Sequence, residues 1–215
     1  MFKAVIFDLD GTLVNSLEDL ADSMNIVLGN YHFPTHELQD YKHLTGKGIR
    51  NLVRDALPQG NNDEELINKC FDSMIDVYSN NCVNKTKPYD GITELLDELV
   101  LRKMKLAVFS NKADEFTKKI VLNIFSKWNF KEVIGLTDET YRKPNPQTAL
   151  LISENLDVNP ENMIYLGDTG IDMQTANNAG MYAVGVLWGF RTKEELISNG
   201  AKCVLNKPLD LIEIL

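Results

Sequence analysis

The sequence lacks the features that mark several classes of protein. Only three of its 215 residues are cysteines, and Cys70, Cys82 and Cys203 are far apart, which argues against a disulfide framework or a cysteine zinc site. No apolar run approaches the roughly 20 residues that a membrane-spanning helix needs. The first residues lead directly into a predicted strand, which leaves no room for a signal peptide. These absences predict a cytoplasmic protein.

Basic residues are also scarce. The chain has 22 lysines and arginines against 31 aspartates and glutamates, a formal net charge of −9. This balance argues against a nucleic-acid backbone or an anionic membrane as the partner. An anionic small molecule stays compatible with it if a few local cations and a metal supply positive charge.

Short apolar runs alternate with segments of helical period from about residue 90 onward. Such alternation is typical of right-handed βαβ units, so the predicted fold class is α/β, with a doubly wound, Rossmann-like parallel sheet. The first run of the chain is apolar throughout, which favours a strand buried on both faces. The predicted strands are Ala4–Phe7, Leu106–Phe109, Glu132–Ile134, Met163–Leu166, Tyr182–Val186 and Lys202–Leu205.

One long segment breaks the alternation and contains no strand-like run. Ser16 followed by Asp19 is typical of a helix start, with Ser16 as the N-cap. An apolar stripe of helical period follows, and prolines separate further helical pieces. We therefore predict an α/β core formed by residues 1–15 and 88–215, with an all-helical cap, residues 16–87, inserted into it.

Polar and charged side chains follow the predicted strands. Asp8 and Asp10 follow the first strand, Ser110 the second, and Asp168 the fourth. Because parallel sheets bind ligands at the carboxyl ends of their strands, these side chains are expected to meet at one edge. Asp10 could instead be a solvated turn residue before Gly11, since Asp-Gly is a common turn.

The chemistry of these residues predicts phosphoryl transfer with bound Mg²⁺. Asp8, Asp168 and the backbone carbonyl of Asp10 are hard oxygen ligands for that ion. Asp8 is the expected nucleophile, and Asp10 the group that protonates the leaving oxygen and deprotonates water. Ser110 and Lys143 are expected to hold the phosphoryl oxygens, and Asp172 to ligate the metal or support the site.

Several smaller signals have two interpretations each. Lys47, between two glycines of the predicted cap, either binds a substrate carboxylate or lies in an ordinary connection between helices. Lys112 either meets phosphate or faces solvent. Asn111 and Thr12 adjoin the catalytic residues, and together with Lys47 they form the predicted substrate-binding set.

Four motifs in order resemble those of the haloacid dehalogenase superfamily of hydrolases. They are Asp8-Leu9-Asp10-Gly11-Thr12-Leu13, the strand end at Ser110, Lys143-Pro144, and Gly167-Asp168 through Asp172. The second aspartate resembles the phosphatase branch, and the helical insertion resembles the small cap of the family. The segments around Ser110, Lys143 and Gly185–Gly189 are most similar to phosphoglycolate phosphatases.

The function expected from this resemblance is Mg²⁺-dependent hydrolysis of a small phosphomonoester, similar to phosphoglycolate, through an aspartyl-phosphate. Its partner is then a small phosphorylated metabolite, and the protein a monomer or a weak homodimer. Two enzymatic alternatives are a phosphotransferase similar to β-phosphoglucomutase and a pyrophosphate or nucleotide phosphatase. A third alternative is a catalytically silent, ligand-binding regulatory protein, which the complete motif set disfavours.

Overall fold

The computed structural model describes residues 1–46, 48–60 and 63–215. The chain divides into two compact units: an α/β unit, Met1–Asn15 with Pro88–Leu215, and a helical unit, Ser16–Lys87. No helix of the described chain is long and apolar enough to cross a membrane. Two short strands, β2 (Val14–Asn15) and β3 (Lys87–Pro88), pair where the chain leaves the α/β unit and returns to it.

A parallel sheet forms the centre of the α/β unit. Its six strands lie in the order β5-β4-β1-β6-β7-β8, and every neighbouring pair is parallel. All four residues of the central strand β1 are fully buried, as expected for a strand covered on both faces. The predicted doubly wound sheet is thus confirmed. Its strands are β1 (Ala4–Phe7), β4 (Lys105–Ala113), β5 (Phe130–Leu136), β6 (Met163–Gly167), β7 (Tyr182–Val186) and β8 (Cys203–Leu205).

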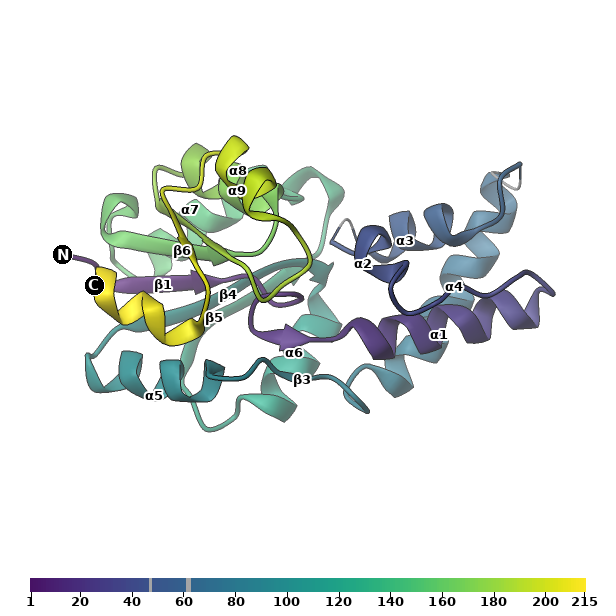
Figure 1. The fold of residues 1–215 in the computed structure, drawn as a ribbon, viewed down its shortest axis with the longest axis horizontal. Coiled ribbons are helices and arrows are strands. Elements are labelled where there is room, and N and C mark those ends of the chain that lie inside the picture. Colours follow the sequence, from purple (N-terminus) through teal and green to yellow (C-terminus); the bar gives the residue numbers. More distant parts are fainter. Residues whose placement is uncertain (47, 61–62) are drawn as a thin grey trace. The chain divides into compact units, whose positions relative to one another are not determined.

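Helices cover both faces of this sheet (Figure 1). One face carries α5 and α6, and the other carries α7, α8 and α9. The sequence of α5 shows why it packs there: Ile92, Leu95, Leu96 and Leu99 follow helical spacing and are all fully buried. The helices are α5 (Ile92–Leu101), α6 (Asp114–Ile124), α7 (Gln147–Asn155), α8 (Gly170–Asn178) and α9 (Lys193–Ser198), with 3₁₀ turns η1 (Glu139–Tyr141), η2 (Pro160–Asn162) and η3 (Pro208–Ile214).

The helical unit packs around its two longest helices, α1 and α4. Met24 and Val27 of α1 are fully buried, as are Met74 and Tyr78 of α4. Burying each such side chain contributes about 1.5–3 kcal/mol. The helices of this unit are α1 (Leu17–Asn30), α2 (Tyr41–Leu44), α3 (Ile49–Ala56) and α4 (Glu64–Asn81).

The predicted capping of the first helix of this unit is wrong in its detail. α1 does begin at Leu17, but the Ser16 side chain makes no capping hydrogen bond. The backbone of Ser16 (φ −104°, ψ 6°) lies outside the extended region that a capping serine adopts. Asp19, the acidic residue expected to complete the cap, is engaged with a distant segment instead.

That segment is the end of the helical unit, at Lys85 and Thr86. The Asp19 carboxylate accepts hydrogen bonds from the Lys85 N–H at 2.9 Å, the Thr86 N–H at 2.8 Å and the Thr86 hydroxyl at 2.7 Å. Asp19 is only 2% exposed. The buried carboxylate therefore joins the first turn of α1 to the last residues of the unit.

Replacing Asp19 by alanine should lower the free energy of unfolding by about 3 kcal/mol, because the buried N–H and hydroxyl of Thr86 and the part-buried N–H of Lys85 lose a charged acceptor. Asp22→Ala is a matched control, since Asp22 pairs with the Lys85 ammonium at 2.7 Å but both side chains are about half exposed. Such a pair contributes about 0–1 kcal/mol. Equal losses in urea denaturation of the two variants would contradict the assigned role.

Candidate active site

Three neighbouring strands bring polar side chains to one edge of the sheet. Asp8 follows β1, and its N–H donates to the Leu166 carbonyl at 2.9 Å, which extends the pairing with β6 past the strand end. Asp168 follows β6, and Ser110 lies in β4, on the other side of β1. Asp8, Ser110 and Asp168 are 8%, 2% and 0% exposed. The topology thus brings the predicted carboxylates and hydroxyl to the same edge.

Lys143 is a buried cation between two carboxylates. Its Nζ donates to Asp8 Oδ1 at 2.8 Å and to Asp172 Oδ1 at 2.7 Å, and its side chain is 2% exposed. The rings of Phe109 and Tyr165 lie 5.2 and 5.6 Å from Nζ. Burial alone would lower the pKa of Lys143, but the two carboxylates outweigh it and hold that pKa well above its ordinary value. The side chain therefore stays charged.

The three carboxyl groups of Asp8, Asp168 and Asp172 outnumber the buried ammonium group of Lys143. Burial raises the pKa of Asp8 from 3.8 to about 7, and the Asp172 charge raises it too, against the opposing effect of Lys143. Burial and the charges of Asp172 and Asp8 also raise the pKa of Asp168 well above its ordinary value. A divalent cation would relieve this repulsion and favour the ionised carboxylates.

The donor set fits a hard divalent cation such as Mg²⁺. Asp8, Asp168 and Asp172 each offer a carboxylate oxygen, and the three atoms lie within 4.8 Å of one another. Asp172 has partners on both oxygens, because Oδ1 accepts from Lys143 and Oδ2 from the Thr169 hydroxyl at 2.6 Å. Asp172 is therefore suited to positioning Lys143.

Two glycines leave the space that Asp168 occupies. Gly11 has φ +84°, and a Cβ there would lie 2.3 Å from Asp168 Oδ2; a Cβ on Gly189 would lie 2.3 Å from Asp168 Cβ. The freed space lets the Phe190 N–H donate to Asp168 Oδ2 at 2.8 Å and the Thr12 hydroxyl to Oδ1 at 3.3 Å. The loop after β7 therefore orients Asp168, a role that the sequence did not predict.

The predicted substrate-binding residues have different surroundings. Thr12 is fully buried, with its hydroxyl on Asp168 and its carbonyl accepting from Trp188 Nε1 at 2.9 Å. Asn111 Oδ1 accepts from the Lys143 N–H at 2.9 Å. Both side chains thus have partners within the site that position catalytic groups. Lys47 lies outside the described residues.

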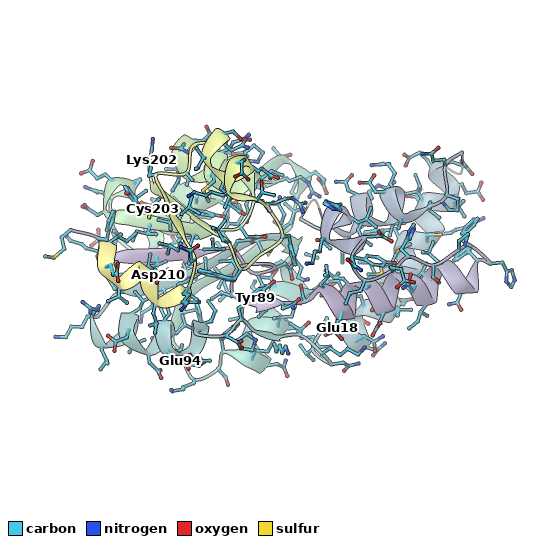
Figure 2. The ribbon with its side chains drawn as sticks, viewed as in Figure 1. Glu18, Tyr89, Glu94, Lys202, Cys203 and Asp210 are labelled. Carbon is cyan, nitrogen blue, oxygen red and sulfur yellow. The ribbon has the colours of Figure 1, made fainter. Side chains whose placement is uncertain are left out.

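Lys112 lies in the candidate site, and the interpretation that it faces solvent is wrong. Its side chain is 2% exposed, and Nζ donates to Asp10 Oδ1 at 2.8 Å, so it does not face solvent. Tyr89, labelled in Figure 2, follows β3, and burial together with the charges of Asp168 and Asp10 raises its pKa. The sequence signal that could have placed Lys112 in the site is its position two residues after Ser110, at the polar end of a predicted buried strand.

The chain matches the haloacid dehalogenase-like hydrolase family over residues 5–186, and it belongs to that family. It is 31% identical to a phosphoglycolate phosphatase of Psychrobacter arcticus, over 90% of this chain and 87% of the relative. It is 26% identical to the N-acetylmuramic acid 6-phosphate phosphatase of Pseudomonas aeruginosa, over 99% and 94%. Within the family, this enzyme stands among the phosphatases.

A solved structure shares the fold over nearly the whole chain. It is a provisionally named phosphoglycolate phosphatase from Lactobacillus delbrueckii subsp. bulgaricus, with a TM-score of 0.91 and 28% sequence identity. The match covers 99% of this chain and 98% of that one. The family predicted from the four motifs is therefore confirmed.

Proposed function

We propose that this protein is a divalent-metal-dependent phosphatase that hydrolyses a small, carboxylated phosphomonoester through an aspartyl-phosphate on Asp8. The observation that carries the proposal is the buried contact between Asp8 and Lys143, at 2.8 Å. The Asp168 carboxylate lies close to Asp8, and Asp10 follows Asp8 two residues later in the sequence. A carboxylate alone would repel a phosphate dianion, and the charged lysine counters that repulsion.

Each residue has one task in the proposed reaction. An Asp8 oxygen forms a bond to phosphorus as the bond to the leaving oxygen breaks, and Asp10 gives that oxygen its proton. Asp10 then takes a proton from the water that attacks phosphorus, and the bond to Asp8 breaks to release phosphate. Ser110 and Lys143 hold the phosphoryl oxygens. When bound by Asp8, Asp168 and the Asp10 carbonyl, Mg²⁺ supplies further positive charge to those oxygens.

The relatives support the substrate class. Phosphoglycolate and N-acetylmuramic acid 6-phosphate, which the named relatives act on, share a carboxylate and a phosphate monoester. Phosphoglycolate is the first candidate because the relatives named for it reach 31% identity, against 26% for the other.

The test compares pairs of substrates in which one member has a group that bears a carboxylate and the other lacks that group. Phosphate release with Mg²⁺ should show a higher kcat/KM for phosphoglycolate than for ethyl phosphate. It should likewise be higher for N-acetylmuramic acid 6-phosphate than for N-acetylglucosamine 6-phosphate. Equal values within both pairs would overturn the carboxylate preference, and no release from any ester would overturn the phosphatase assignment. Transfer of phosphate to a second sugar would instead indicate a phosphotransferase.

Asp10→Asn should reduce kcat/KM for alkyl phosphates by about 10²–10⁴-fold, because their leaving oxygen needs a proton. Aryl phosphates with a good leaving group should lose much less, since kcat/KM reports the step in which that group departs. Steady-state phosphate release with both kinds of ester makes the comparison. An equal loss on both would point to a structural role for Asp10.

Mg²⁺ should raise the thermal unfolding midpoint of the protein, by an amount equivalent to about 2.7 kcal/mol at about 100 times Kd. A proton competes with the metal for Asp8, whose pKa is about 7 without a cation. The affinity for Mg²⁺, measured by calorimetry, should therefore fall as the pH is lowered through neutrality. Asp168→Asn should lose most of the thermal shift. A full shift in that variant would exclude Asp168 as a ligand.

A further inference from the structure

The two aspartates of the Asp8-Leu9-Asp10 motif each pair with a different buried lysine. Lys143 contacts Asp8 at 2.8 Å, and Lys112 contacts Asp10 at 2.8 Å. Each lysine side chain is 2% exposed. Burying an ammonium group is costly unless it is paired, so a lysine at this depth with a carboxylate partner is a built feature of the site.

The backbone of Lys112 is fixed on both sides. Its N–H donates to Ser110 Oγ at 3.2 Å, and its carbonyl accepts from the Thr117 hydroxyl at 3.2 Å. A Cβ on Gly135 would lie 2.7 Å from that carbonyl, which shows how closely β5 packs against it. The ammonium group therefore reaches Asp10 from a rigid part of β4.

A shift of register between β4 and β5 falls at this place, between Phe109 and Ala113. Ser110, Asn111 and Lys112 lie within it, and all three side chains are nearly buried, at 2–8% exposure. Irregular pairing of this kind often changes the direction of side chains beside active sites. Here the Asn111 side chain accepts from the Lys143 N–H and the Lys112 side chain donates to Asp10, both within the candidate site, while the Ser110 hydroxyl accepts from the Lys112 N–H.

We propose that Lys112 is a positioning residue for Asp10, and that it holds the carboxylate where it transfers protons to the leaving oxygen and from water. This inference rests on the proposed phosphatase mechanism. Lys112 itself neither gives nor takes a proton in either half of the reaction. It acts through Asp10, whereas Lys143 acts on Asp8 and the phosphoryl group.

The proposal predicts that replacing Lys112 has the same kind of effect on kcat/KM as replacing Asp10, but a smaller one. Lys112→Met keeps the length of the side chain and removes the ammonium group. Its kcat/KM for an alkyl phosphate should fall by about 10–100-fold, and its kcat/KM for 4-nitrophenyl phosphate by less than about threefold. Lys118→Met is the matched control, because Lys118 is an exposed lysine of the adjacent helix α6 and should change neither value.

A double-mutant cycle separates this role from two others. If Lys112 acts through Asp10, adding Lys112→Met to Asp10→Asn should change kcat/KM by less than about threefold on either ester. If Lys112 binds phosphate or only supports the fold, the losses should multiply. In Lys112→Met alone, kcat/KM should then fall by the same factor for both esters. Either result overturns the proposal.

The cycle also decides if Lys112→Met alone fails to fold. The double variant removes both charges of the pair, so it leaves no unpaired buried carboxylate or ammonium group, and its comparison with Asp10→Asn is sufficient. Thermal unfolding of each variant checks the fold. The activity of the parent enzyme distinguishes failure of the proposed function from failure of the role of Lys112. If the parent has no phosphatase activity, the proposed function is wrong. An active parent with additive variants overturns only the role of Lys112.

Discussion

Replacing Asp8 by asparagine should abolish turnover and make the metal-free protein more stable. An amide cannot form the covalent bond to phosphorus, so kcat should fall by at least about 10⁴-fold for every phosphomonoester, whatever its leaving group. Mg²⁺ with beryllofluoride, which mimics a phosphorylated aspartate, should inhibit the parent. It should not bind the variant.

The gain in stability follows from the pKa of Asp8. The folded protein raises that pKa from 3.8 to about 7. Between these pH values Asp8 therefore keeps its proton in the folded protein and has lost it in the unfolded chain. The ionised carboxylate therefore lowers stability progressively as the pH rises from about 4 to about 7. Asparagine has no such ionisation. Urea denaturation at about pH 8 should show Asp8→Asn above the metal-free parent by roughly 1–2 kcal/mol.

Asp90→Asn is the matched control, since Asp90 is an exposed aspartate of the same unit. It should leave kcat unchanged. Substantial turnover by folded Asp8→Asn would exclude Asp8 as the nucleophile. A lower stability than the parent at about pH 8 would mean that the contact with Lys143 outweighs the burial of the charge.

The parts of the fold that the sequence predicted depend on local patterns. The run Ala4–Phe7 is apolar throughout, and a strand buried on both faces is the structure that such a run favours. The buried residues of α5 recur with the period of a helix, which indicates both the element and its buried face. Once the strands are ordered in a parallel sheet, Asp8 and Asp168 must follow at the same edge.

The parts that could not be predicted depend on contacts between distant residues. Lys112 and Asp10 are 102 positions apart in sequence, and no local pattern indicates which carboxylate a buried lysine meets. Asp19 fits a helix cap by its spacing from Ser16, yet three donors of Lys85 and Thr86 take its carboxylate. A cap contributes only about 1 kcal/mol, so a tertiary contact of a buried carboxylate readily replaces it.

The loop after β7 gives a second example. Gly189 ends the segment Gly185–Gly189 that resembles phosphoglycolate phosphatases, but the resemblance does not say what the residue does; its importance follows from Asp168, which fills the space of a missing Cβ. The neighbouring Phe190 contributes a backbone N–H, which every residue except proline has. Contacts made by the backbone have no signature in the side chains, so a single sequence does not indicate them.

Lys143→Met should reduce kcat/KM by about 10³-fold, and to the same extent for alkyl and aryl phosphates. The lysine donates to Asp8 and is placed to stabilise the phosphoryl oxygens, and loss of one such donor typically costs about 10²–10³-fold. That effect does not depend on the leaving group. The pattern across the two esters thus distinguishes Lys143 from Asp10 and Lys112, whose loss should affect mainly the alkyl phosphate.

The same substitution should lower the free energy of unfolding by about 3–5 kcal/mol, because it leaves Asp8 and Asp172 buried without their cation. Adding Asp172→Asn should recover part of this stability, since it removes one of the two unpaired carboxylates, but it should restore no activity. Lys127→Met is the control, because Lys127 pairs with Asp97 at an exposed site and should change stability by less than about 1 kcal/mol. Unfolding curves without metal measure all four proteins. If the double variant is no more stable than Lys143→Met, charge repulsion between the carboxylates is not what Lys143 relieves, and its contribution comes from packing against Phe109 and Tyr165.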